Sequence, residues 1–288
     1  FYLLQKTLEH VSGLSWNALA EREVFAPLGM PDSSFLTRSA PTADNAYGHV
    51  KTWMKRHFPD DAHAFVTDVT AGYAQINVQG PRSRELLQSI TNADLSNEAF
   101  PFRTAREIDI GFARALCVRI TYLGELGYEL YVSSEQATHV YDRVVRAGQS
   151  VGLRHAGLKA LASLRMEKGY RDYGHDIDNT DSVLEVGLGF AVDLKKPGGF
   201  LGRDAVVAKK AAGPMTRRLV QVLVKDPEPM MFHAEVVRRD GQAKGYVRAA
   251  SYGHTLGGAV GLVMVEAGEP VDQAYLDKGT WEVEIAGK

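Results

Sequence analysis

The stretch Tyr122-Leu123-Gly124-Glu125-Leu126-Gly127-Tyr128-Glu129 lies between two apolar segments, residues 113–122 and 128–132. Glycine adopts the positive φ angles that tight turns require, so this stretch predicts a β-hairpin with its turn at residues 124–127. The turn also places two carboxylates, Glu125 and Glu129, four residues apart. Taken alone, the stretch is explained more simply by glycines that serve the turn and glutamates that face solvent.

Elements on both sides of this hairpin alternate between strand and helix patterns. Gly80-Pro81 predicts a turn, and Ser133-x-x-Gln136 matches a capping box that opens a helix ending at Gly148. The buried stripe of that helix is predicted to be Ala137, Val140, Tyr141, Val144 and Val145. Further strands are predicted at residues 65–69 and 73–78, and further helices at residues 82–90 and 155–168. This order predicts an α+β unit with helices on one face of an antiparallel sheet.

From Arg217 onward the pattern consists of strands and turns. Asp240-Gly241 is typical of a tight hairpin turn. The predicted strands are residues 219–224, 234–238, 245–249, 261–265 and 281–285. These elements predict a small β-barrel or sandwich.

Composition excludes several classes of protein. The 288 residues are 45% hydrophobic and 24% charged, with a net charge of -2, so we expect a globular chain of about two domains and no nucleic-acid partner. No run of about 18 apolar residues occurs, and we therefore expect no membrane span. Cys117 is the only cysteine, which leaves no internal disulfide, and its apolar neighbours predict a buried packing thiol. His155 and His175 have no third partner at metal-ligand spacing, so no metal site is predicted.

A second informative stretch runs from Leu164-Arg165-Met166-Glu167-Lys168-Gly169-Tyr170 into Tyr173-Gly174-His175-Asp176-Ile177-Asp178. An isolated Arg-x-Glu at a helix end is usually a surface pair. In this order, however, the two stretches together resemble the glycine-cleavage T-protein family. The resemblance covers about residues 51–288 and continues through residues 185–190 and 200–205. Residues 93–102 and 167–171 look most similar to the sarcosine and dimethylglycine dehydrogenase branch.

The resemblance implies a fold and a chemistry. The implied fold is T-protein-like, with a ferredoxin-like antiparallel sheet and helices in residues 51–213, a C-terminal β-barrel in residues 214–288, and a short helical leader in residues 1–50. A flavin domain of such proteins oxidises an N-methyl amine, and the T-protein-like module captures the one-carbon fragment on N5 of tetrahydrofolate. The implied partners are folate and a flavin-dependent dehydrogenase domain or subunit. FAD itself is expected only in that other domain or partner, because no Gly-x-Gly-x-x-Gly follows a strand here. The implied location is the cytoplasm, or the mitochondrial matrix in a eukaryote.

The resemblance also implies residues that bind the folate. Glu129 reads the pterin, because one carboxylate accepts two parallel hydrogen bonds from a ring N-H and the 2-amino group. Lys159 stands near the position of a folate-facing arginine of the family, and it can meet a carboxylate as a point charge. Tyr122 and Tyr173 are predicted to pack against the folate rings, with core packing as the alternative. Glu125 and Arg165 complete the predicted set. No catalytic residue is predicted, because the family's aspartate belongs to a segment before Trp53 that we expect to be missing.

The first fifty residues have a different resemblance. Residues 1–13 and 24–35 look like a segment of serine hydrolases related to class C β-lactamases. The Ser-x-x-Lys nucleophile motif is missing, and the Gly-x-Ser-x-Gly at residues 148–152 follows a helix rather than a strand. Two alternatives to folate chemistry therefore stay open, a non-catalytic regulatory or interaction module of the same fold and a remnant of a serine hydrolase.

Overall fold

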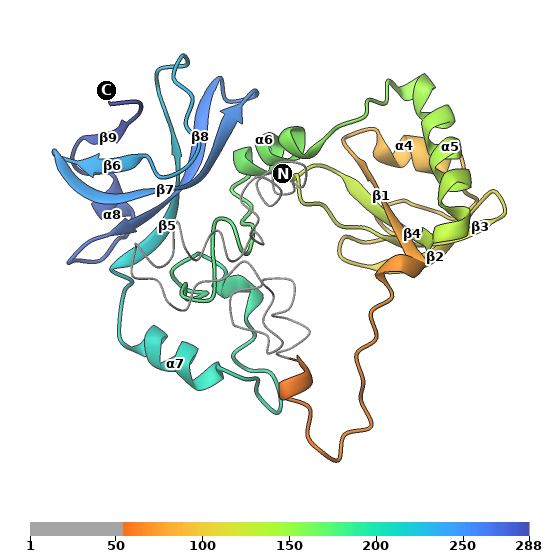
Figure 1. Ribbon diagram of the computed structural model, residues 1–288, viewed down its shortest axis with the longest axis horizontal. Coiled ribbons are helices and arrows are strands. Elements are labelled where there is room, and N and C mark those ends of the chain that lie inside the picture. The colour runs from red at the N-terminus through yellow and green to blue at the C-terminus, as the bar shows by residue number, and fades with distance from the viewer. Residues whose placement is uncertain (1–53, 288) are drawn as a thin grey trace, which may run out of the picture. The chain divides into compact units, whose positions relative to one another are not determined.

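The computed structural model describes residues 54–287, and the predicted helical leader at residues 1–50 lies outside this range (Figure 1). The chain divides into two compact units, residues 1–68 and 69–288. In the first unit, residues 54–56 are helical. The strand predicted at residues 65–69 is wrong: this segment has no ladder partner, and the Phe65 side chain is 87% exposed.

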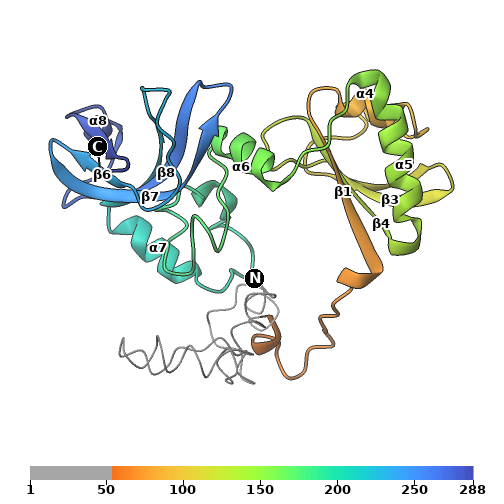
Figure 2. The ribbon, with the colours of Figure 1, turned by 45° about the horizontal axis from the view of Figure 1, so that its top comes forward.

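The second unit contains a four-stranded antiparallel sheet in which the two strands of the predicted hairpin pair. The first of them ends at Val118 instead of Tyr122, so a loop over residues 119–126 replaces the predicted tight turn, and Gly127 belongs to the second strand. The strands of the sheet are β1 (Tyr73–Gln79), β2 (Ala105–Ile110), β3 (Ala113–Val118) and β4 (Gly127–Ser133), in the order β1-β4-β3-β2. β2 was not predicted from the sequence. Helices α4 (Ser83–Gln88) and α5 (Ala137–Gly148) pack on one face of the sheet (Figures 1 and 2). The core between them contains Phe100, Tyr128, Leu130, Val132 and Val140.

Alternation along β4 decides which side chains face this core. Tyr128, Leu130 and Val132 are buried, whereas Glu129 and Tyr131 point to the opposite face and are half-buried. Successive side chains of a strand point to opposite faces, so the strand pattern itself keeps the Glu129 carboxylate out of the apolar core.

The start of α5 differs from the prediction. Ser133 and Gln136 make no capping bond with their side chains; instead a short 3-10 turn, η3 (Ser134–Gln136), leads into the helix. The backbone N–H of Ala137 donates to the carbonyl of Ser134, so a backbone carbonyl, and no side chain, accepts from this N–H group at the start of the helix. Tyr141 is exposed rather than part of the buried stripe.

The remaining elements form the second half of the unit. Helices α6 (Leu158–Glu167) and α7 (Arg203–Ala211) precede the strands β5 (Arg217–Leu223), β6 (Val236–Arg239), β7 (Gln242–Gly253), β8 (Gly258–Glu266) and β9 (Trp281–Glu284), with α8 (Gln273–Leu276) before β9. Short 3-10 turns lie at η2 (Thr70–Gly72), η4 (Gln149–Val151) and η5 (Gly189–Ala191). No helix of residues 54–287 is long and apolar enough to span a membrane.

These strands form a curved antiparallel sheet in the order β5-β8-β7-β6-β9. β7 bends strongly where its register with β8 shifts between Val247 and Ala249 (Figure 2). Eight of the nine residues of β8 are buried, because apolar clusters cover both of its faces. The α+β class and the C-terminal barrel domain are thus confirmed, although within the described residues β5 and β9 do not pair to close the ladder.

Ion pairs fasten the irregular segment between α6 and α7. Arg165 and Asp176, both almost fully buried, form a bidentate pair. Arg217 of β5 contacts Asp181 at 2.7 Å and Glu185 at 3.1 Å. The segment is therefore anchored by charge pairs to α6 at one end and to the C-terminal sheet at the other.

Candidate functional site

A pocket of about 760 Å³ lies at the free edge of β1. Its volume is within the range typical of small-molecule sites. The apolar part of its wall comes from β1, α5, α6 and the loop before α6: Ile76, Val78, Val144, Val145, Leu153, Leu158, Leu161 and Leu164. Its polar groups include Gln75, Asn77, Tyr122, Glu125, Glu129, Arg154 and His155. An apolar pocket with a few polar groups is what an aromatic ligand with hydrogen-bonding edges requires.

Glu129 is the pocket carboxylate whose orientation is fixed by a hydrogen bond within the fold. It lies in the middle of β4, directly opposite Asn77 of β1. The hydroxyl of Tyr131 donates to Glu129 Oε2 at 2.7 Å, and this bond raises the pKa of Tyr131 to about 12. Within the described residues Glu129 Oε1 has no partner, so the carboxylate is fixed at one oxygen and open at the other.

Tyr122 and Glu125 reach the same pocket from the hairpin turn. The Tyr122 hydroxyl donates to the backbone carbonyl of Arg171 at 2.8 Å, and burial raises the pKa of Tyr122 to about 12. Gly124 has a φ of +73°, and the side chain of Lys168 lies against it, so a Cβ at this position has no room. The turn glycine thus serves both the backbone conformation and the close approach of a neighbouring segment.

The other three predicted residues do not line the pocket. Lys159 is exposed on the first turn of α6, and Tyr173 is 53% exposed in the loop beyond that helix. Arg165 is buried near the C-terminal end of α6, where it pairs with Asp176 and donates to the carbonyl of Tyr170 at 2.9 Å. Burial by itself lowers the pKa of Arg165, but its bonds to Asp176 outweigh this effect and keep the pKa above its ordinary value. Arg165 therefore holds the segment after α6 against this helix.

Helix α6 connects the pocket to the C-terminal sheet. Leu158, Leu161 and Leu164 contribute to the pocket wall. On the other side, Met166 belongs to an apolar cluster of the C-terminal sheet, and Ser163 Oγ donates to the carbonyl of Tyr252 at 2.6 Å. One wall of the pocket is therefore held in place by the C-terminal sheet.

Several pocket residues were not predicted from the sequence. Gln75 and Asn77 lie on the same face of β1, a strand that was predicted. The sequence does not show which strand pairs with β1, so it could not place these two side chains beside Glu129. Tyr141 and His155 form a 2.8 Å hydrogen bond at the pocket margin. His155 therefore has a hydrogen-bond partner at the pocket, whereas in the sequence it was considered only as a metal ligand and predicted not to be one. Cys117 is buried as predicted, and burial raises its pKa to about 12.

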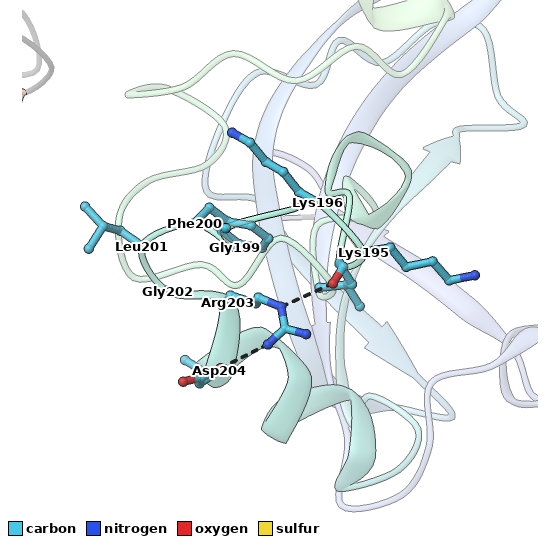
Figure 3. Close-up of a pocket in the computed structure, with 11 residues that line it drawn as sticks. Lys195, Lys196, Gly199, Phe200, Leu201, Gly202, Arg203 and Asp204 are labelled. Atoms are coloured by element: carbon cyan, nitrogen blue, oxygen red, sulfur yellow. Dashed lines mark hydrogen bonds and ion pairs between the residues drawn. The ribbon is translucent and has the colours of Figure 1, made fainter.

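A second hollow, of about 920 Å³, is lined by residues 194–196 and 198–205 (Figure 3). Its wall is a glycine-rich loop and the first turn of α7. Arg203 is engaged with the carbonyl of Leu194 at 3.2 Å and with Asp204 at 3.4 Å. The side chains of Lys195 and Lys196 point in different directions (Figure 3). Because its polar groups do not converge, this larger hollow is a weaker candidate than the pocket at β1.

Comparison with known proteins identifies the family. The GCVT N-terminal domain model matches residues 32–196, and the glycine cleavage T-protein C-terminal barrel domain model matches residues 217–288. The chain belongs to the glycine cleavage T-protein family. Folate-dependent one-carbon transfer is the chemistry of this family. No comparison supports the serine-hydrolase resemblance, and the T-protein match itself includes residues 32–50.

The similar proteins include an oxidase, a dehydrogenase and a regulatory subunit. The chain is 43% identical to 4-methylaminobutanoate oxidase (formaldehyde-forming) of Paenarthrobacter nicotinovorans, over 78% of this chain and 26% of that protein. It is 36% identical to human mitochondrial sarcosine dehydrogenase, over 91% of this chain and 28% of the relative. It is 32% identical to the mouse mitochondrial pyruvate dehydrogenase phosphatase regulatory subunit, over 83% of this chain and 28% of that one. The chain thus spans little more than a quarter of the length of these relatives.

The fold agrees with a solved member of the T-protein family. The aminomethyltransferase T of the glycine cleavage system from Bartonella henselae superposes with a TM-score of 0.62 and 24% identity, covering 75% of this chain and 56% of that structure. This likeness confirms the fold.

Proposed function

We propose that this chain binds tetrahydrofolate in the pocket at β1 and serves as the folate module of an enzyme that oxidises an N-methylated amine. The proposal is carried by the fixed carboxylate of Glu129 in a largely apolar pocket. Glu129 accepts hydrogen bonds from the pterin edge, and charge-assisted bonds of this kind are about twice as strong as neutral ones. Tetrahydrofolate, when bound, supplies the N5 nitrogen that accepts the one-carbon unit.

The rest of the pocket suits the other parts of this ligand. The ring of Tyr122 lines the pocket, with its hydroxyl bonded to the Arg171 carbonyl and its ring centroid 6.0 Å from that of Tyr170, so the fold holds an aromatic ring where the ligand rings would pack. The leucines of α6 supply apolar surface for the rings of the ligand. Arg154 lies at the pocket with no acidic partner within residues 54–287, where it suits a carboxylate at the far end of the ligand.

The coupled reaction is assigned from the named relatives. The names of two relatives state their substrates, sarcosine and 4-methylaminobutanoate. Both substrates are amines with an N-methyl group. We propose sarcosine, dimethylglycine or a similar N-methylated amine as the source of the one-carbon unit. A flavin-dependent dehydrogenase domain or subunit oxidises that amine, and the cytoplasm or mitochondrial matrix is the proposed location.

Titration calorimetry with 5-formyltetrahydrofolate, a stable analogue with N5 occupied, tests the binding proposal. We expect saturable binding in the micromolar range. Glu129→Ala removes one partner of a charged hydrogen bond, worth about 1.5–3 kcal/mol, so affinity falls roughly 10- to 100-fold. Glu135→Ala removes the same charge from an exposed site outside the pocket and should leave affinity unchanged. Equal binding by Glu129→Ala and the wild type would refute the site.

A second candidate function is a non-catalytic regulatory or interaction module. The similarity to a phosphatase regulatory subunit supports it. If the folded chain does not bind 5-formyltetrahydrofolate, that result would favour this candidate over the folate module.

A further inference from the structure

Asn77 stands next to the Glu129 carboxylate in the structure, although the two residues are far apart in sequence. Asn77 and Glu129 are directly opposed partners in the β1–β4 ladder, and both line the pocket. Opposed residues of an antiparallel pair share one face of the sheet, with Cβ atoms roughly 4.5–5.5 Å apart. The two polar ends therefore reach the same region of the pocket.

The hydrogen bonds around this pair leave a defined pattern of free groups. Gln75 Nε2 donates to Asn77 Oδ1 at 3.4 Å, which occupies the acceptor end of the amide. Asn77 Nδ2 makes no hydrogen bond within residues 54–287 and remains a free donor. Tyr131 holds Oε2 of Glu129, as described above. The pocket thus presents a carboxylate acceptor and an amide donor side by side.

This pattern is complementary to one edge of a 2-amino-4-oxo-pyrimidine ring. Along that edge the 2-amino group and the ring N-H are donors, and the 4-oxo oxygen is an acceptor. Glu129 matches the two donors, and a neighbouring amide N–H matches the oxo group. A 4-amino ring presents a donor where Asn77 also presents a donor, and a site built to hydrogen-bond one group rejects the analogue that lacks it.

We propose that Asn77 is a specificity-determining residue of this pocket, which donates from Nδ2 to the 4-oxo group of the ligand ring. The inference rests on the proposed folate function and goes further by naming a residue that, together with Glu129, distinguishes 4-oxo from 4-amino pterins. It assigns Asn77 a role that neither Glu129 nor Tyr122 can fill, because neither has a free donor in the pocket.

The test compares 5-formyltetrahydrofolate with its 4-amino counterpart. The 4-amino ring also lacks the ring N-H that Glu129 accepts, so the role of Asn77 is measured by how the ratio of the two affinities changes between variants. Calorimetric titrations are made with the full chain, with Asn77→Leu, and with Asn92→Leu as an exposed control outside the pocket. The wild type and the control should prefer the 4-oxo ligand. In Asn77→Leu, affinity for the 4-oxo ligand should fall about 5- to 20-fold while the 4-amino ligand changes little, so the preference shrinks.

A second variant separates recognition from a structural role. Asn77→Asp replaces the donor by an acceptor, so it should weaken the 4-oxo ligand and strengthen the 4-amino ligand relative to wild type. Equal losses for both ligands in Asn77→Leu, or an unchanged ratio in both variants, would overturn the role of Asn77 while leaving the folate site intact. Failure of the wild type to bind either ligand would instead overturn the proposed function, and this inference with it.

Discussion

The hydroxyl of Tyr131 donates a 2.7 Å hydrogen bond to Oε2 of Glu129, two residues earlier on the same face of β4. This bond restricts the glutamate to one orientation on a strand whose other face is in the core. A prealigned carboxylate loses less conformational freedom on binding a ligand than a freely rotating one. Tyr131 is therefore expected to contribute to affinity through Glu129.

Removing the Tyr131 hydroxyl should weaken folate binding and leave the fold intact. Ordering a side chain on binding costs about 0.5–1.5 kcal/mol, so releasing Glu129 by Tyr131→Phe should lower affinity for 5-formyltetrahydrofolate roughly 2- to 10-fold. Calorimetry measures the affinity, and urea unfolding shows whether stability is retained. In a Glu129→Ala background the same substitution should have no further effect, since the two residues act through one bond. Additive losses would contradict this coupling.

Stability should fall at alkaline pH because two tyrosines have raised pKa values. The pKa values of Tyr122 and Tyr131 are raised from 10.0 to about 12. Between these values the unfolded chain has released protons that the folded chain still binds, so unfolding becomes easier as pH rises from about 10 to about 12. The Tyr122→Phe, Tyr131→Phe double variant should show a shallower fall in urea midpoint over this range. An identical slope in wild type and variant would show that other groups cause the effect.

Breaking the Arg165–Asp176 pair should be strongly destabilising. Asp176→Asn leaves the guanidinium of Arg165 buried without its charge partner, which costs about 3–5 kcal/mol. Urea unfolding measures the loss. The matched control is Asp109→Asn, which breaks the exposed 3.5 Å pair with Arg114 and should cost less than about 1 kcal/mol. Similar losses of unfolding free energy in the two variants would mean that the buried pair does not stabilise the fold more than the exposed pair does.

Gly245 should not tolerate a side chain. A Cβ at this position would overlap the backbone carbonyl of Met264 on the neighbouring strand β8, where neither atom has room to move. Gly245→Ala is expected to lower the free energy of unfolding by more than about 2 kcal/mol. Gly268→Ala, which has open space around its Cβ, should change it by no more than about 0.5 kcal/mol. Thermal or urea unfolding of the two variants distinguishes these outcomes.

The thiol of Cys117 should be inert in the folded protein. Burial raises its pKa to about 12, so at pH 8 it remains protonated as well as inaccessible. A thiol reagent such as dithiobis-nitrobenzoate should react with about one equivalent of thiol in urea and negligibly in buffer. Rapid reaction in buffer would contradict the burial of β3.

Much of the fold followed from local patterns. The glycines at 124 and 127 predicted the hairpin, and Asp240-Gly241 predicted the turn between β6 and β7. The prediction failed at residues 65–69, because β-branched and aromatic side chains favour a strand only where a partner strand is present. The capping box failed for a related reason, since the backbone of η3 already satisfied the helix start.

By itself, the sequence determined the family resemblance and the α+β order of elements, because these depend on residue types at fixed spacing along the chain. The choice of Glu129 followed from that resemblance. Only the tertiary structure decided that Glu129 meets Asn77 and Tyr122 at one pocket and that Arg165 pairs with Asp176. Which strand lies beside β4, and which side of α6 faces the C-terminal sheet, depend on packing between distant segments. Such packing is a property of the whole core, and no single stretch of residues encodes it.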